Sequence, residues 1–278
     1  MLSIVASLAL ALLSAAGPAA MDGSVASADG VMIHFHAEGR GDPALVFVHG
    51  WSCDSDYWGA QVAEFAPHHR VVTLDLAGHG KSGSNRKDWT IAAFGADVAA
   101  VVGKLDLKNV VLIGHSMGGP VTVEAALLMP ERAKLLVPVD SLQNAEFKLK
   151  PEQAAGFLGA FEKDFPGTVR QFFSQFFPPT APREIVEKVL DKAASANPAS
   201  AVAAMRSLIA YDLTASLPRV KAPIRAIDSD SNPVAIEVNR KYAPRFDAVI
   251  MPGVGHFPML VAPKEFNRLL ADAVADIK

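Results

Sequence analysis

The sequence predicts an α/β protein built on a mostly parallel sheet, and three observations carry that prediction. From residue 29 onward, short runs rich in Val, Ile and Leu alternate with longer amphipathic stretches, the pattern of strands joined by helical crossovers. Half of the 278 residues are hydrophobic and 20% are charged, which supplies one sizeable core. The stretch from about Gln143 to Pro218 has no strand-like run. We therefore expect a single domain over 29–278 with a helical cap inserted at about 143–218.

The strand and helix patterns can be placed one by one along the chain. Strands are expected at Val31–His36, Ala44–His49, Val71–Leu76, Val110–Gly114, Leu135–Val139, Ile224–Ile227 and Ala248–Met251. Helices are expected near Tyr57–Phe65, Ile91–Lys104, Gly119–Met129, Ala235–Tyr242 and Pro263–Ile277. The first two strands are too close in sequence for a helical crossover, so they are expected to form an antiparallel hairpin at one edge.

Residues 1–28 are interpreted as a signal peptide, with cleavage near residue 19 or residue 28. The run "MLSIVASLALALLSAAGPAA" is the one long uncharged apolar segment, and small residues suited to a cleavage site follow it. The protein is thus expected to be exported, without a stable membrane anchor. No positive residue precedes Arg40, and the alternative is a cytoplasmic protein that starts at Met21.

Charge and cysteine content restrict the possible partners. The net charge of −3 comes from evenly mixed acidic and basic residues with no basic stripe, which argues against a nucleic-acid partner and favours a small molecule. The stretch Gly78–Ser82, "GHGKS", ends like a phosphate-binding loop, but the first glycine of that motif would fall at Asp75. The single cysteine, Cys53, has no internal disulfide partner and is interpreted as a buried, inert thiol. The sequence leaves the oligomeric state open.

Ser116, in "LIGHSMGGP", is the candidate nucleophile. It lies between a predicted strand that ends at Gly114 and a helix that follows, so it occupies a sharp strand-to-helix turn. Small neighbours permit the strained turn, and Gly114 and Gly118 supply them. The turn would expose the hydroxyl and direct helix amides toward the same space.

A serine nucleophile needs a base, and His256 is the candidate. In "MPGVGHFPML" it follows the last predicted strand, on a loop at the same edge of the sheet as Ser116. Other histidines fit less well, because they lie on an edge strand (His34 and His36), on solvated loops (His68 and His69) or inside the turn itself (His115), and His79 is interpreted as structural.

An acidic side chain should fix the orientation of the histidine. The strand "PIRAI" ends in "DSDSN", which places Asp228 and Asp230 at a strand end between Ser116 and His256 in chain order. Asp230 is the predicted acid because Asp228 follows the strand directly and is interpreted as its cap. Asp140, which ends "LLVPVD", is the main alternative, since an acid after that earlier strand could reach the same histidine. Asp228 is a further alternative.

Two backbone amides should stabilise the oxyanion of an acyl-transfer intermediate. The predicted donors are the N–H of Met117, directly after the nucleophile, and the N–H of Trp51 in "HGW". Trp51 and Phe257 are also expected to contact substrate, and the Phe-rich cap to supply an apolar pocket. The cap phenylalanines are Phe147, Phe157, Phe161, Phe165, Phe172, Phe173, Phe176 and Phe177.

Together, "HGW", "LDLAGHGKSG", "GHSMGGP", "DSD" and "GVGHF" make the chain from about Asp29 onward resemble the α/β-hydrolase superfamily. The resemblance is to the serine-nucleophile branch, and to its small bacterial esterases and cofactor-free haloperoxidase-like perhydrolases in particular. It implies the α/β-hydrolase fold, with Ser116, Asp230 and His256 as the triad and Trp51 and Met117 as oxyanion donors. Relatives that act as epoxide hydrolases or haloalkane dehalogenases carry aspartate at the Ser116 position, which disfavours those activities.

The function predicted from these residues is hydrolysis of carboxylic esters of small apolar acyl groups through an acyl-enzyme. This chemistry requires neither a metal nor an organic cofactor. Hydrolysis of a lactone or of a carbon–carbon bond on the same triad is an alternative, and a non-catalytic protein that binds small molecules is another.

Overall fold

The computed structural model describes residues 20–277 and contains one eight-stranded sheet with the strand order β1-β2-β4-β3-β5-β6-β7-β8. Strands β3 to β8 run parallel to one another, whereas β1 and β2 at one edge are antiparallel to their neighbours. The strands are β1 (Met21–Ala26), β2 (Met32–Glu38), β3 (Ala44–Val48), β4 (Val71–Leu74), β5 (Val110–His115), β6 (Ala133–Val139), β7 (Ile224–Ser229) and β8 (Phe246–Met251). The predicted mostly parallel sheet is confirmed.

The predicted hairpin between the "VMIHFH" and "ALVFV" strands is wrong. Strand β2 pairs antiparallel with β4, where Phe35 lies opposite Leu74, and β3 lies on the far side of β4. The physical reason is burial: every residue of β3 is buried, as a central strand of a parallel sheet requires, whereas β2 alternates buried and half-buried residues. Closeness in sequence did not decide the pairing.

Strand β1 lies within the segment that the sequence assigned to a signal peptide. It pairs along its whole length with β2, from Met21 opposite Ala37 to Ala26 opposite Met32. The Ser27 hydroxyl then donates to Asp97 at 2.6 Å. Residues 21–27 are therefore part of the folded domain, and cleavage near residue 28 would remove an edge strand. The predicted cleavage site near residue 19 falls at the end of the stretch, 1–19, that lies outside the described residues.

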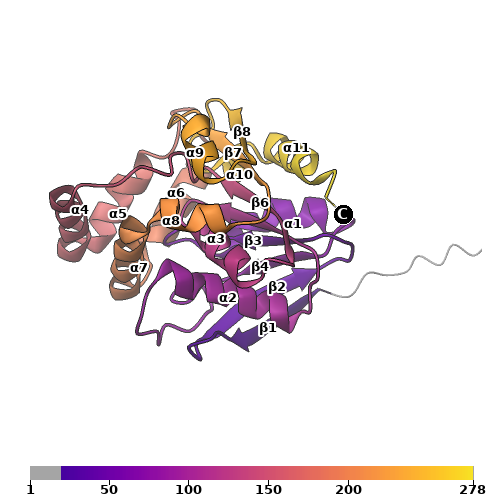
Figure 1. Ribbon diagram of the computed structural model, residues 1–278. Coiled ribbons are helices and arrows are strands. Elements are labelled where there is room, and N and C mark those ends of the chain that lie inside the picture. The colour runs from indigo at the N-terminus through magenta and orange to yellow at the C-terminus, as the bar shows by residue number, and fades with distance from the viewer. Residues whose placement is uncertain (1–19, 278) are drawn as a thin grey trace, which may run out of the picture.

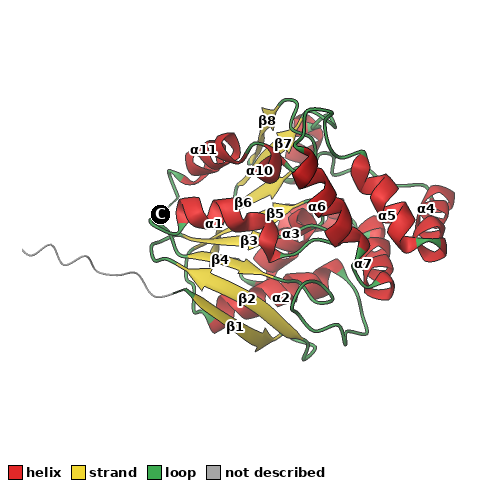
Figure 2. Ribbon diagram, turned by 180° about the vertical axis from the view of Figure 1, so that it is seen from behind, coloured by secondary structure: helices red, strands yellow, loops and turns green. Residues whose placement is uncertain are grey.

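Helices cover both faces of the sheet. Helices α2 (Ile91–Lys104) and α3 (Gly118–Leu128) pack together on one face (Figure 1), and α1 (Gly59–Phe65) and α11 (Pro263–Val274) lie on the other (Figure 2). Short helices η1 (Ser55–Trp58), α9 (Ile236–Tyr242) and α10 (Pro258–Val261) complete the domain. No helix among residues 20–277 is both long and apolar enough to cross a membrane.

The segment between β6 and β7 is helical and forms a cap at one end of the sheet (Figure 1). It comprises α4 (Pro151–Lys163), α5 (Phe165–Ser174), α6 (Arg183–Ala194), α7 (Pro198–Ala210), α8 (Leu213–Ser216) and η2 (Leu217–Arg219). The parallel strands all point their carboxyl ends toward the same edge, where loops from several strands meet. The candidate site lies between this edge and the cap.

Candidate active site

Ser116 occupies the strand-to-helix turn that the sequence predicted. It follows β5 directly, precedes α3 and has a φ of 52°, in the left-handed region that a serine seldom adopts. A Cβ at Gly114 would collide with the carbonyl of Gly118, and a Cβ at Gly118 would meet the Val48 carbonyl oxygen at 2.5 Å. The two glycines are thus required by the close approach of β3, β5 and α3, which holds the strained turn in place.

Main-chain and hydroxyl contacts on both sides fix this turn. The Ser116 N–H donates to the Val139 carbonyl at 3.0 Å. The Ser116 carbonyl accepts hydrogen bonds from the Gly119 N–H at 2.9 Å and from the Ser141 hydroxyl at 2.6 Å. Ser116 is therefore tied to the end of the neighbouring strand β6.

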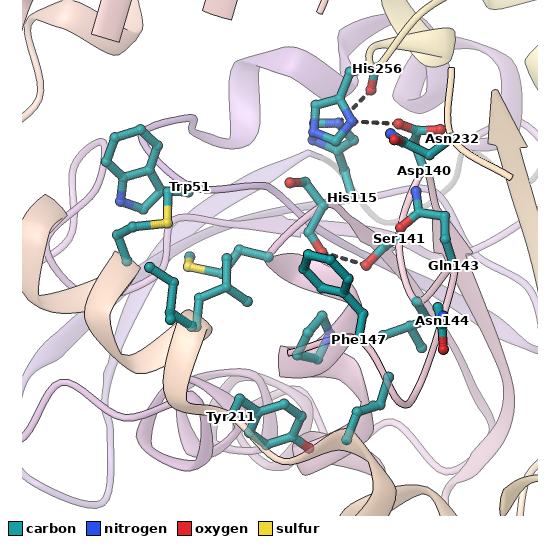
Figure 3. A pocket seen from close by; sticks show the side chains of 18 of the residues that line it. Trp51, His115, Asp140, Ser141, Gln143, Asn144, Phe147, Tyr211, Asn232 and His256 are labelled. Carbon is teal, nitrogen blue, oxygen red and sulfur yellow. Dashed lines mark hydrogen bonds and ion pairs between the residues drawn. The ribbon is translucent and has the colours of Figure 1, made fainter. Parts of the chain in front are cut away.

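His256 lies on the loop after β8 and contacts Asp140. Its Nδ1 lies 2.5 Å from a carboxylate oxygen of Asp140, which is buried at the end of β6 (Figure 3). Because the carboxylate can only accept, Nδ1 carries the proton and Nε2 is left as the basic nitrogen. The backbone of His256 is also held, with its N–H on the Phe176 carbonyl at 2.8 Å and its carbonyl accepting from His115 Nε2 at 2.8 Å.

The prediction that Asp230 holds His256 is wrong, and the alternative Asp140 takes that place. Asp230 is exposed in the turn after β7 and accepts a hydrogen bond from the Gly253 N–H at 2.9 Å. Asp140 has a φ of 44°, which turns the chain sharply at the end of β6 and brings its carboxylate to His256. Asp140 and Asp230 both lie between Ser116 and His256 in chain order, and β6 and β7 end side by side, so proximity to the histidine depends on the local turn.

The electrostatic environment keeps Asp140 ionised. Burial raises the pKa of its carboxyl, but the hydrogen bond and charge of His256, together with the Ser229 N–H at 2.7 Å, outweigh burial and bring the pKa below its usual value. An ionised acid beside a histidine stabilises the imidazolium that forms when the histidine accepts a proton. The pair is therefore suited to general-base chemistry.

Trp51 and Met117 present backbone amides beside Ser116. Both residues line the same cavity as Ser116 and His256. Within residues 20–277, neither backbone N–H donates a hydrogen bond to a protein acceptor. A Cβ at Gly50 would lie 3.2 Å from the Cβ of Ser116, which shows how closely the "HGW" turn approaches the serine. Two free amides next to one hydroxyl are the arrangement that an oxyanion needs.

Buried neutral histidines brace this turn. His49 donates from Nδ1 to the Gly50 carbonyl at 2.7 Å and accepts from the Leu76 N–H at 3.0 Å. His79 accepts from the N–H of Ser52, a residue with a φ of 54°. Burial lowers the pKa of His49, and it lowers that of His79 to about 3, so both rings stay uncharged at neutral pH. They hold the backbone and place no charge next to the site.

The cavity has a volume of about 580 Å³ and is mostly apolar. Phenylalanines of the cap form one wall, and Gln143, Asn144 and Asn232 add polar groups at another (Figure 3). Lys148 also lines the cavity. The lining phenylalanines from the cap are Phe147, Phe157, Phe172, Phe173 and Phe176. Phe147 is 69% exposed, so it stands at the mouth of the cavity. A pocket of this size and lining suits a small molecule with an apolar part.

The predicted substrate contacts Trp51 and Phe257 both lie in the wall of the cavity. The indole of Trp51 donates to the Ala201 carbonyl of α7 at 2.7 Å and packs edge-on against Phe161 at 5.2 Å. Phe257 is fully buried and stacks on Phe177 with ring centroids 5.1 Å apart. No local sequence pattern predicts the indole contact, which connects the "HGW" turn to the cap.

Cys53 also lines the cavity. Burial raises the pKa of its thiol well above the usual range, consistent with an inert thiol. Across residues 20–277, no group of three or more His, Cys, Asp or Glu side chains is arranged to hold a metal ion.

A strand-to-helix serine, a histidine after the last strand and a cap inserted after β6 define an α/β hydrolase, and the family comparison agrees. The model of the alpha/beta hydrolase family matches residues 45–269. The chain therefore belongs to that family, and the resemblance seen in its motifs is confirmed.

Individual relatives and solved structures are similar to this chain over most of its length. The chain is 27% identical over 262 residues to pimeloyl-[acyl-carrier protein] methyl ester esterase of Yersinia pseudotuberculosis, across 88% of this chain and 98% of that protein. Among solved structures, an esterase from Exiguobacterium antarcticum has a TM-score of 0.83 at 20% identity, across 92% of this chain and all of the other. A bromoperoxidase from Bacillus anthracis has a TM-score of 0.83 at 22% identity over the same shares. Both structures show the shared fold.

Proposed function

We propose that this protein is a serine hydrolase that cleaves carboxylic esters through an acyl-enzyme. The observation that carries the proposal is the convergence of Ser116, in its strained turn, with the His256–Asp140 pair on one cavity. The esterase named above, to which the chain is similar over most of its length, supports ester hydrolysis as the reaction.

In the proposed mechanism, His256 Nε2 takes the proton of the Ser116 hydroxyl as the serine oxygen attacks the ester carbonyl. The N–H groups of Trp51 and Met117 donate to the oxyanion, and Asp140 stabilises the imidazolium. The imidazolium then protonates the leaving alcohol, and the carbonyl re-forms as an acyl-serine. His256 next deprotonates a water that attacks this ester, and it returns the proton to Ser116 as the acid product leaves.

The cavity supports a substrate with a neutral, apolar acyl group. Phe157, Phe172 and Phe173 supply aromatic surface, and Met205 and Leu208 of α7 supply aliphatic surface. Among the described lining residues, Lys148 is the one cationic side chain apart from the histidines, and it pairs with Asp212 at 3.2 Å. Nothing in the wall therefore favours an acyl group that carries a charge at its buried end.

The test is Ser116→Ala together with labelling by a fluorophosphonate probe. The variant should lose about six orders of magnitude in kcat toward short p-nitrophenyl esters, and the probe should label the parent at Ser116 alone. A folded parent that resists the probe would favour a binding protein. A labelled parent that turns over simple esters poorly but opens lactones or splits ring-cleavage products would keep the serine mechanism and change the substrate.

We also propose that the protein is exported, with cleavage before β1. Cleavage near residue 19 leaves the whole of β1 in place, whereas cleavage after residue 28 removes it together with the Ser27–Asp97 hydrogen bond. Mass spectrometry of the mature N-terminus tests this proposal. An intact leader in cytoplasmic protein, or a cytoplasmic protein whose initiator residue is Met21, would contradict it.

A further inference from the structure

A second aspartate, Asp228, lies at the end of β7 beside Asp140. Val139 of β6 is in register with Ile227 of β7, so the residues that follow them lie next to one another. The Ser229 N–H donates to Asp140 Oδ1 at 2.7 Å, and the Ser141 N–H donates to Asp228 Oδ1 at 2.9 Å. Each carboxyl thus accepts from the residue that follows the other, and the two strand ends are clamped reciprocally.

The bond from Ser141 to Asp228 restrains a strained turn that serves two site residues. Asp140 and Leu142, on either side of Ser141, have φ values of 44° and 60°. The Ser141 hydroxyl donates to the Ser116 carbonyl at 2.6 Å, while Asp140 faces His256. The carboxyl of Asp228 therefore supports the nucleophile on one side and the acid on the other, although it contacts neither His256 nor the Ser116 hydroxyl.

The surroundings of Asp228 favour an uncharged carboxyl. The side chain is fully buried, and its Oδ2 has no hydrogen-bond partner among the described residues. Burial raises its pKa to about 8; the negative charge of Asp140 adds to the rise, and the Ser141 N–H opposes it. The carboxyl of Asp228 is therefore mostly neutral at neutral pH and ionises at mildly alkaline pH.

The charged groups around Asp228 are few. From β6 it faces Asp140, whose far oxygen contacts His256 of the loop after β8. From β8 its register partner is the apolar Ile250. Asp230 turns outward to the Gly253 N–H. No described cation pairs with the Asp228 carboxyl, so its ionisation would place a second negative charge beside Asp140 without compensation.

We propose that Asp228 is a positioning residue that works as a neutral carboxyl: it holds the Asp140–Leu142 turn in its active arrangement, and its ionisation places a second negative charge against Asp140, which pushes the two strand ends apart and limits activity at alkaline pH. This inference rests on the proposed function, since it presumes that Ser116, His256 and Asp140 perform the reaction.

The experiment compares kcat against pH for the parent, Asp228→Asn and Asp230→Asn on p-nitrophenyl acetate, with the buffer rate subtracted. Asparagine keeps the oxygen that accepts from Ser141 and cannot ionise. With a pKa of about 8 for Asp228, parent kcat at pH 9 should fall about tenfold below its plateau, while KM stays level. Asp228→Asn should hold the plateau through pH 9, and Asp230→Asn, exposed two residues away, should follow the parent.

A further variant separates the hydrogen bond from the charge. Asp228→Ala leaves the Ser141 N–H without an acceptor, and we expect its kcat to lie about tenfold below that of Asp228→Asn at every pH. Profiles of the parent and Asp228→Asn that superimpose would overturn the positioning role. A parent that a fluorophosphonate does not label would instead overturn the proposed function itself, so the two failures can be told apart.

Discussion

The ends of β6 and β7 each carry an aspartate, and these two neighbouring side chains are in opposite protonation states. Asp140 contacts His256 at 2.5 Å and has a pKa below its usual value, whereas Asp228, without a cationic partner, has a pKa of about 8. Both are buried, and each accepts one backbone N–H from the other strand. The difference in pKa therefore comes from the imidazole of His256, which stabilises the ionised form of Asp140 and has no counterpart beside Asp228.

The largest expected effect is that of removing the charge from the β6 end. Asp140→Asn should lower kcat by about four orders of magnitude, because an amide can hold His256 in the wrong tautomer and cannot stabilise the imidazolium. The measurement is steady-state hydrolysis of a short p-nitrophenyl ester. Asp230→Asn is the matched control, and a larger loss in that variant than in Asp140→Asn would reverse the assignment of the acid.

An intermediate effect is expected at Ser141, which connects the two strand ends to the nucleophile. Ser141→Ala removes the 2.6 Å hydrogen bond to the Ser116 carbonyl and should lower kcat about tenfold, the cost of one hydrogen bond at a strained turn. The rate of fluorophosphonate labelling provides a second measurement that does not depend on deacylation. An unchanged labelling rate would show that the strand ends do not act on Ser116 through this hydroxyl.

The smallest effect concerns stability and tests the β7 end without any assay of activity. The folded-state pKa of Asp228 lies above the unfolded value, so between about pH 4 and pH 8 the unfolded chain binds fewer protons and stability falls as pH rises. Asp228→Asn removes this loss. The Tm of Asp228→Asn minus the Tm of the parent should therefore be larger at pH 8 than at pH 5, by about 3 °C or more. This corresponds to about 1 kcal/mol for a chain of this size.

The measurement is thermal unfolding by circular dichroism at the two pH values. Asp230 is exposed, so Asp230→Asn should show the same change in Tm between pH 5 and pH 8 as the parent. A difference in Tm between the parent and Asp228→Asn that stays constant with pH would show that Asp228 is ionised throughout.

Much of the molecule could be predicted from local patterns in the sequence. The Val- and Ile-rich runs predict a parallel sheet because strands buried on both faces must be apolar throughout. "GHSMGGP" identifies the turn at Ser116 because Gly114 and Gly118 are required wherever backbones approach so closely. His256 follows from its place after the last strand. All of these features depend on residues near one another in the sequence.

What the tertiary structure decided was the choice among groups that are distant in sequence. The pairing of β2 with β4 rather than with β3 depends on burial across the whole sheet. The assignment of Asp140 rather than Asp230 to His256 depends on a left-handed turn at the end of β6, which a sequence pattern does not encode. Both aspartates follow strands that end at the same edge, and chain order does not rank them. Only the three-dimensional arrangement fixes which carboxylate meets the imidazole, because a hydrogen bond of 2.5 Å depends on the position and direction of each side chain.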